Sequence, residues 1–135
     1  DVGREARAVL TNLVDQCGET ANIYIRRDAA RVSIAQVQGT TTVRSVVEVG
    51  VPYALESGAA GVLLLDNAPG KILKRLATSD DRLTLDALER EVAAAKERGY
   101  AVSHGQRELG ASAVAAPIKS PDNRVLAALS ISGPT

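Results

Sequence analysis

Apolar side chains recur along the chain with two different periods, which predict helices in some segments and strands in others. In residues 4–18 the apolar positions from Ala6 to Cys17 are spaced by three and four, with charged and amide side chains between them. This is the spacing of an amphipathic helix, and Gly18 is a residue type that commonly ends one. Cys17 falls on the apolar stripe, so we expect a small buried hydrophobic residue there rather than a reactive thiol.

The next segments change to the period of two that is typical of strands. We expect three strands arranged as an antiparallel meander, over residues 20–26, 31–38 and 43–49. The apolar phase of the second strand slips between Ile34 and Ala35, which predicts either a bulge or burial of both faces. The Gly-Val-Pro sequence at 50–52 is expected to stop the third strand, because proline has no N–H group for a sheet ladder.

The middle of the chain is predicted to be helical, and the last third returns to strands. We expect helices over residues 56–66, 69–77 and 85–98, followed by strands over 100–104, 111–118 and 125–132. The helix over 85–98 is well marked at its end, because Lys96, Arg98 and Gly99 are favourable at a helix C-terminus. Two strand-rich segments on either side of a helical one predict an α+β fold with an antiparallel sheet.

Composition argues against several classes of function. The chain has 135 residues, the length of one domain. Its 16 basic and 16 acidic residues cancel and its only aromatic residues are three tyrosines, so it lacks the positive charge and the stacking groups that favour nucleic-acid binding. One cysteine allows neither an internal disulfide nor a zinc cage, and no segment resembles a signal peptide or a membrane span. We expect a cytoplasmic protein without membrane contact, metal or cofactor.

The late strands are built from side chains that are too small to fill a core, because alanine packs little against a pleated sheet. Alternation places these side chains on one face of each strand, and we call them the small-residue floor: Ala101, Ser103, Ala111, Ala113, Ala115, Ala128, Ser130 and Ser132. If the three faces coincide, they predict the base of a ligand cavity that is apolar with hydroxyls at one end. The alternative is that the alanines let the helix over 85–98 lie close to the sheet.

Four short sequences stand out in the last third of the chain. They are Arg-Gly-Tyr-Ala-Val at 98–102, Glu-Leu-Gly at 108–110, Val-Ala-Ala-Pro-Ile at 114–118 and Ala-Ala-Leu-Ser-Ile-Ser-Gly-Pro at 127–134. Their order and spacing over about 35 residues resemble the C-terminal signature of IclR-type transcriptional regulators. The Gly-Val-Pro sequence and the small residues that follow it are similar to the same family, so the resemblance covers nearly the whole chain.

The resemblance implies a GAF-like fold, in which a curved antiparallel sheet of about six strands is flanked by helices. It implies an effector-binding domain for a small organic acid or aromatic catabolite, assembled as a homodimer or homotetramer. The family binds operator DNA through an N-terminal winged helix-turn-helix, which we expect to be absent from this chain because it begins at Asp1 and contains no methionine. Carried over by position, the ligand-binding residues would be Val51, Ser57, Gly58, Ser103, Ala111, Ala113, Ser130 and Ser132.

The chain departs from the family at positions that bear on the ligand. The family has a histidine soon after the proline, where this chain has Ala54. It has a Gly-Lys pair a few residues later, where this chain has Ala59 and Ala60. Fewer charges favour a neutral or weakly polar ligand, or a carboxylate held by backbone amides near Ser57 and Gly58.

An enzymatic role is not expected. His104 is the only histidine, and alternation points it away from Ser103, so a catalytic dyad there is disfavoured. The alternative to a sensor is a structural dimerisation domain whose pocket is vestigial. A metabolite would raise the thermal stability of a sensor but not of a purely structural domain.

Overall fold

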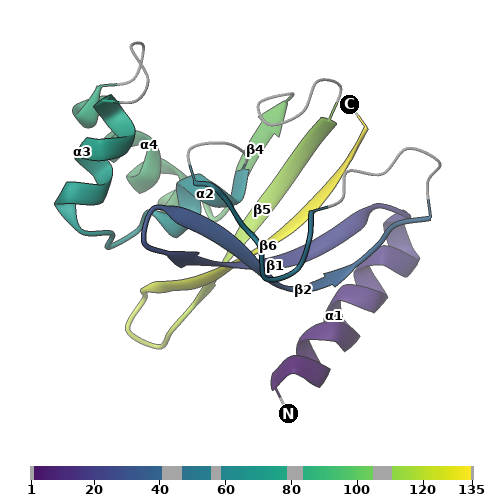
Figure 1. Cartoon of the computed structure of the whole chain (residues 1–135). Coiled ribbons are helices and arrows are strands. Elements are labelled where there is room, and N and C mark those ends of the chain that lie inside the picture. The colour runs from purple at the N-terminus through teal and green to yellow at the C-terminus, as the bar shows by residue number, and fades with distance from the viewer. Residues whose placement is uncertain (1, 41–46, 56–58, 79–83, 105–110, 135) are drawn as a thin grey trace.

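The computed structural model describes residues 2–40, 47–55, 59–78, 84–104 and 111–134, with the elements labelled as in Figure 1. The helices are α1 (Val2–Cys17), α2 (Ala59–Leu64), α3 (Gly70–Thr78) and α4 (Leu85–Arg98). The strands are β1 (Thr20–Arg27), β2 (Ala30–Val37), β3 (Pro52–Ala54), β4 (Ala101–His104), β5 (Ala111–Lys119) and β6 (Val125–Pro134).

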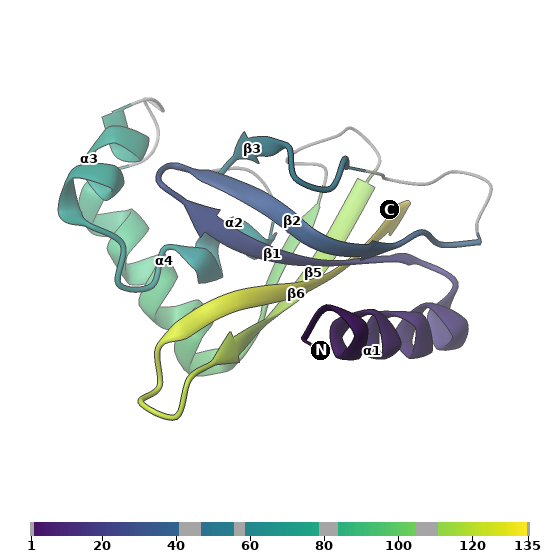
Figure 2. The ribbon, with the colours of Figure 1, turned by 60° about the horizontal axis from the view of Figure 1, so that its bottom comes forward.

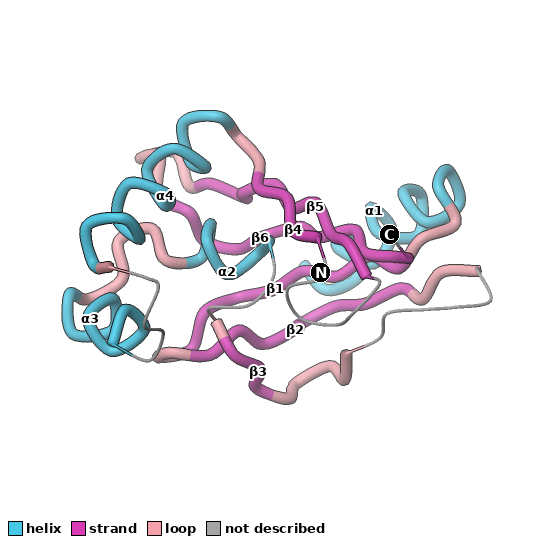
Figure 3. Tube along the Cα trace, turned by 90° about the horizontal axis from the view of Figure 1, so that it is seen from above, coloured by secondary structure: helices cyan, strands magenta, loops and turns pink. Residues whose placement is uncertain are grey.

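The strands form one six-stranded antiparallel sheet in the order β3-β2-β1-β6-β5-β4. The first three strands make the predicted meander, and the chain returns after the helices to place β6 beside β1. The sheet curls around α2, as Figure 3 shows from above. We call the face toward α2 the inner face and the opposite face the outer face. The predicted α+β fold with a curved antiparallel sheet is confirmed.

The third strand lies later in the chain than the sequence pattern predicts. Residues 47–49 are not in a strand and 41–46 lie outside the described residues, so the predicted strand over 43–49 is wrong in its described part. The third strand begins at Pro52, within the sequence that was expected to stop it. Proline is tolerated there because it is the first residue of an edge strand that pairs only with β2.

The bulge predicted in the second strand is confirmed. Ile23 of β1 pairs with Ala35, and Tyr24 pairs with Ser33, so Ile34 is the extra residue. The bulge lets Asn22, Tyr24 and Ser33 all face inward while Ile34 points to solvent, 49% exposed.

Local signals explain where two of the helices end. Gly18 follows α1 with φ +76°, a left-handed conformation that glycine adopts without strain, and its N–H donates to the carbonyl of Val14 at 2.7 Å. Helix α4 begins after Thr84, whose Oγ1 accepts a hydrogen bond from the N–H of Ala87 at 3.0 Å. It ends at Gly99, with φ +89°, as the sequence predicts.

The prediction that Cys17 is buried is wrong, because its side chain is exposed. The apolar face of α1 buries Leu10 and Val14, but Cys17 is the last residue of the helix and lies beyond the core that this face covers. Its Sγ accepts a weak hydrogen bond from the N–H of Glu19 at 3.5 Å.

Helices cover the two faces of the sheet and make two cores. On the outer face α1 packs its Leu10 and Val14 on β1 and β2 (Figure 2). On the inner face α2 packs on β4, β5 and β6 over the alanines at 101, 115 and 128. Helix α4 packs on α2 and α3, so the alternative that it lies on the alanines is wrong, and the shorter α2 takes that place.

Candidate functional site

The strand register brings the small side chains of three strands into two rows on the inner face. Ser103 of β4 pairs with Ala113 of β5, which pairs with Ser132 of β6. The adjacent row runs from Ala101 through Ala115 to Ser130. Because residues two apart on a strand share a face, both rows lie on the same side of the sheet. The three faces of the small-residue floor therefore coincide.

Polar side chains from β1 and β2 extend the two rows. Thr20 pairs with Ser132, and Asn22 pairs with Ser130. Thr20, Asn22 and Ser33 of β2 are at most 1% exposed. The sequence pattern does not reveal these residues, since they alternate with apolar side chains that suggest a single buried face.

The side chains of Thr20, Asn22 and Ser33 make hydrogen bonds within the protein. The Asn22 Oδ1 atom accepts hydrogen bonds from Ser33 Oγ at 2.8 Å and from Gln36 Nε2 at 3.1 Å. Gln36 also donates to the carbonyl of Val47 at 2.8 Å, and Thr20 Oγ1 accepts from the N–H of Gly39 at 2.9 Å. These bonds hold the segments that follow β2 against the inner face, so this part of the site is structural.

The serine side chains on β4 and β6 differ from these polar side chains of β1 and β2 in their hydrogen bonding. Ser103, Ser130 and Ser132 are 5–8% exposed, yet within the described residues their hydroxyls make no hydrogen bond to protein. Buried hydroxyls are usually paired with protein, water or ligand. These three hydroxyls are therefore available to a bound molecule, and each can both donate and accept. None of the side chains in the two rows is ionisable.

Helix α2 covers the alanine end of the floor, and among the described helices none is placed on the opposite, serine end, which is formed by Ser103, Ser130 and Ser132. Ala101, Ala115 and Ala128 belong to the core that α2 closes. A close backbone contact fixes α2 in that place: a Cβ added at Gly61 would lie 1.7 Å from the carbonyl oxygen of Leu55. Glycine is needed there because any side chain would push α2 away from the segment that precedes it.

The predicted ligand-binding residues divide into three groups. Ser103, Ala113, Ser130 and Ser132 lie together on the inner face, and Ala111 continues the same strand, although its side chain is outside the described residues. Val51 is 36% exposed and precedes β3, which β2 and β1 separate from β6. Ser57 and Gly58 lie outside the described residues. That these residues bind a ligand stays a prediction.

A buried arginine lies on the inner face away from the serines. Arg31 is 3% exposed, and its guanidinium stacks over the rings of Tyr24, at 4.7 Å, and Tyr53, at 5.5 Å. Its Nε donates to the carbonyl of Ala54 at 3.3 Å, while Nη2 is buried without a hydrogen-bond partner. Arg31 thereby holds β3 on the sheet, a few residues before Ser57 and Gly58 in the sequence. Sequence reasoning missed it, because a single arginine in a strand pattern normally indicates solvent exposure.

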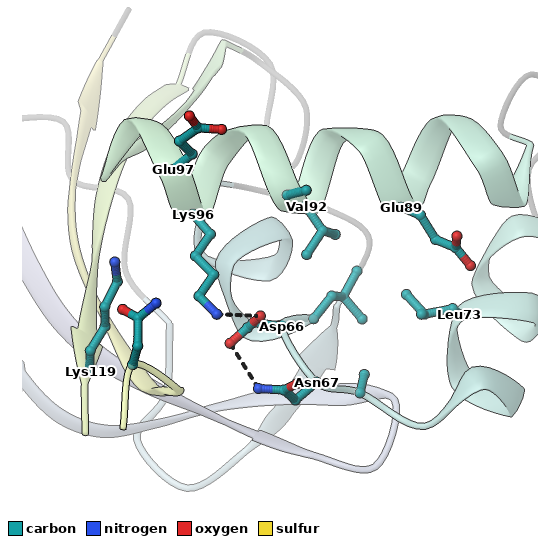
Figure 4. Close-up of a pocket in the computed structure, with 12 residues that line it drawn as sticks. Asp66, Asn67, Leu73, Glu89, Val92, Lys96, Glu97 and Lys119 are labelled. Atoms are coloured by element: carbon teal, nitrogen blue, oxygen red, sulfur yellow. Dashed lines mark hydrogen bonds and ion pairs between the residues drawn. The ribbon is translucent and has the colours of Figure 1, made fainter. Parts of the chain in front are cut away.

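A cavity of about 640 Å³ lies beyond the alanine end of the floor, between the loop after α2, helix α4 and the β5–β6 turn (Figure 4). Asp66 at its base pairs with Lys96 at 3.2 Å and accepts hydrogen bonds from Asn67 at 3.2 Å and from the N–H of Val125 at 3.1 Å. These bonds connect α4 to the hairpin formed by β5 and β6. The cavity contains none of the predicted site residues, and its central carboxylate is already satisfied.

The turn between β5 and β6 carries the one clear electrostatic effect in the described part of the chain. The Ser120 hydroxyl donates to the Asp122 carboxylate and lowers the pKa of that carboxyl, with a further contribution from Arg124. Asp122 is solvent-exposed and lies in the Pro-Asp-Asn sequence of the β5–β6 turn, so this effect supports the hairpin and not a site.

Residues 1–135 match the family described as bacterial transcriptional regulator IclR C-terminal. The chain belongs to the IclR family. It is 33% identical over 138 residues to the HTH-type transcriptional regulator BhcR of Paracoccus denitrificans, a match that covers 96% of this chain and 50% of BhcR. It is 29% identical over 143 residues to the HTH-type transcriptional repressor AllR of Escherichia coli, covering 100% of the chain and 53% of AllR.

Solved structures of IclR-family proteins have the same fold. The crystal structure of an IclR-family regulator from Rhodococcus sp. superposes with a TM-score of 0.87 at 40% identity, covering 96% of this chain and 52% of that one. The Thermotoga maritima IclR structure gives a TM-score of 0.82 at 26% identity, covering 100% and 58%. The resemblance inferred from the sequence is confirmed, and the α+β sheet is consistent with the GAF-like fold of IclR effector domains.

The IclR-family domain described here spans about half the length of the curated relatives it matches. Those relatives are named as transcriptional regulators, which indicates regulation rather than catalysis for the family. None of the helices in the described ranges is long and apolar enough to cross a membrane.

Proposed function

We propose that this domain binds a small organic acid or aromatic catabolite on the serine end of the small-residue floor. Binding there would control operator binding by an N-terminal winged helix-turn-helix in a part of the protein that this chain does not span. The observation that carries the proposal is that the hydroxyls of three buried serines, Ser103, Ser130 and Ser132, have no protein hydrogen-bond partner within the described residues. We also infer that the regulator acts in the cytoplasm, where its operator lies.

The chemistry of the floor favours a compact ligand held by neutral groups. Hydroxyls donate to a carboxylate or accept from a hydroxyl, and the small side chains of Ala113 and its neighbours leave space for an apolar body. Since no charged side chain lies in either row, charge–charge attraction would contribute little. We expect modest affinity and selection by shape.

The first experiment is a thermal-shift screen of small carboxylic acids and aromatic catabolites, followed by calorimetry of each hit. A ligand that binds only the folded state stabilises it by RT ln(1 + [L]/Kd), so the melting temperature rises with the logarithm of the concentration once this exceeds Kd. If no compound shifts the melting temperature at any concentration, the domain is a structural dimerisation domain with a vestigial pocket and the proposal fails.

The second experiment places the ligand on the floor. Ala113→Leu fills the inner face beside two of the serines, so we expect a folded domain that no longer responds to the ligand. Ser130→Leu should behave in the same way. Ala94→Leu is the matched control, because it adds the same bulk at an exposed position of α4, outside both rows of the floor. Unchanged binding by both inner-face variants would show that the ligand lies elsewhere.

A further inference from the structure

Arg31 carries a buried positive charge that the described part of the chain does not balance. The residue is 3% exposed, and none of the ion pairs within the described ranges involves it. Its Nη2 atom is buried without a hydrogen-bond partner, while its Nε donates to the carbonyl of Ala54. Because removing a charge from water is costly, a buried charge is normally paired with an opposite one. The burial of Arg31 therefore calls for a counter-ion.

The packing around the guanidinium of Arg31 leaves one edge for a counter-ion. The rings of Tyr24 and Tyr53 lie over the guanidinium, with their centroids 4.7 Å and 5.5 Å from Cζ. Tyr53 is held in turn, because its hydroxyl accepts a hydrogen bond from the N–H of Glu48 at 2.9 Å. The donors of a guanidinium lie in its plane, so an acceptor belongs at the edge that carries Nη2.

A cavity of about 290 Å³ adjoins this group, between the β1–β2 turn, β3 and α3. Its wall includes Tyr53 and Ala54, the two β3 residues that contact Arg31, and also Arg75 of α3. The remainder of the wall is alanine, proline and leucine, and no Asp or Glu is among the described residues that line it. A small apolar chamber with positive charge at its wall favours an anion that has an apolar body.

We propose that this cavity binds a small carboxylate with a short aliphatic or single-ring body, and that the carboxylate accepts a hydrogen bond from Arg31 Nη2. Such a charge-assisted bond is among the stronger hydrogen bonds in proteins. Because Nη2 is shielded from solvent, the carboxylate reaches it when the half-buried ring of Tyr53 turns aside, which breaks the hydrogen bond from Glu48. The guanidinium of Arg75 adds attraction from the α3 side of the cavity.

The carboxylate site is separate from the serine end of the small-residue floor. Asn22 pairs with Ser130, whereas Arg31 pairs with Arg26, four residues further along β1. At about 3.3 Å per residue, the two places lie roughly 13 Å apart along the strand. The serine end offers neutral groups, and the cavity beside Arg31 offers positive charge. The carboxylate site therefore stands or fails separately from the proposed function.

The test is a titration of the 135-residue chain with sodium benzoate and sodium propionate, followed by NMR at constant ionic strength. Benzamide and propionamide are the neutral counterparts, with nearly the same shape and no charge. We expect both carboxylates to shift the Nε–H signal of Arg31 and the amide signal of Glu48 to saturation. The two amides should leave these signals in place, and this comparison depends on no variant.

Two arginine variants assign the charge that the carboxylate needs. Arg31→Met keeps an apolar stem between the rings and should weaken benzoate binding, read at the Glu48 amide, by at least about tenfold. Arg27→Met is the matched control, because Arg27 is an exposed arginine of the same hairpin. Its affinity for benzoate should stay within about twofold of the wild type. Circular dichroism establishes that each variant is folded.

A third variant separates this cavity from the serine end of the floor. Ala113→Leu fills the serine end and should leave the response of the Arg31 signal to benzoate unchanged. The proposal is overturned if neither carboxylate shifts that signal, or if the neutral amides shift it equally. A folded Arg31→Met that binds benzoate like the wild type would also overturn it, and so would loss of the response in Ala113→Leu.

Discussion

Two kinds of buried serine lie on the inner face, and they have different roles. Ser33 donates to Asn22 and so completes an internal network, whereas Ser130 has no side-chain partner within the described residues. Ser33→Ala should lower the free energy of unfolding by about 1–2 kcal/mol and leave effector affinity unchanged. Ser130→Ala should leave the stability within about 0.5 kcal/mol and weaken effector binding about tenfold. Chemical denaturation and calorimetry on both variants measure the two effects, and equal stability losses would contradict the distinction.

Substitutions of the buried Arg31 can separate the contribution of its packing to stability from that of its charge. Arg31→Ala removes the stacking on Tyr24 and Tyr53 together with the bond to Ala54, so we expect a loss of about 2–4 kcal/mol of unfolding free energy. Arg31→Met retains an apolar chain between the rings and removes the unpaired buried N–H. Arg31→Met should therefore lower the free energy of unfolding by less than half as much as Arg31→Ala. If the two variants are equally destabilised in urea, the contribution of Arg31 comes from its charge and not from its stem.

At the scale of elements, two glycines in helices should respond to the same substitution with opposite signs. Alanine is favoured over glycine in a helix by about 1 kcal/mol. At Gly61 this gain is outweighed, since the new Cβ would overlap the carbonyl of Leu55, and we expect Gly61→Ala to destabilise the domain by about 1–3 kcal/mol. Gly70 is the first residue of α3 and faces open space, so Gly70→Ala should be neutral or slightly stabilising. Thermal denaturation compares the two, and a stabilised Gly61→Ala would mean that α2 is free to move.

Most elements could be predicted from the sequence because their signals are local. The glycines at the ends of α1 and α4, the bulge at Ile34 and the alternation behind the small-residue floor are properties of neighbouring residues. Which helix covers a given face of a strand depends on residues that are far away in the sequence. Asn22 lies on the side of β1 that looks solvent-exposed, and it is buried because α2 covers that side while α1 covers the other. The same limit explains why the sequence left open whether the helix over 85–98 lies on the alanines, a place that α2 takes.

At the scale of the whole molecule, the serine end of the small-residue floor and the outward side chains of β5 and β6 lie on two sides of the same strands. Ala113 faces inward and Val114 faces outward on β5, and Ser130 and Ile131 are related in the same way on β6. A ligand that shifts these strands therefore also shifts the outer face of the sheet. Such coupling between sites is typically 1–3 kcal/mol and is reciprocal.

We therefore predict that effector binding and the homo-oligomeric assembly expected from the family influence each other. Val114 is exposed on the outer face of β5, and Val114→Glu should change effector affinity by about fivefold or more, because it alters the outer side of the strands that carry the serines. The effector should shift the dissociation constant of the assembly by the same factor that assembly changes effector affinity, measured by sedimentation at saturating ligand. Ile34→Glu is the control at an exposed position of β2 and should leave both constants unchanged. If Val114→Glu binds the effector with wild-type affinity, the two faces of the sheet are independent, and the signal to the DNA-binding domain must leave the site through another part of the molecule.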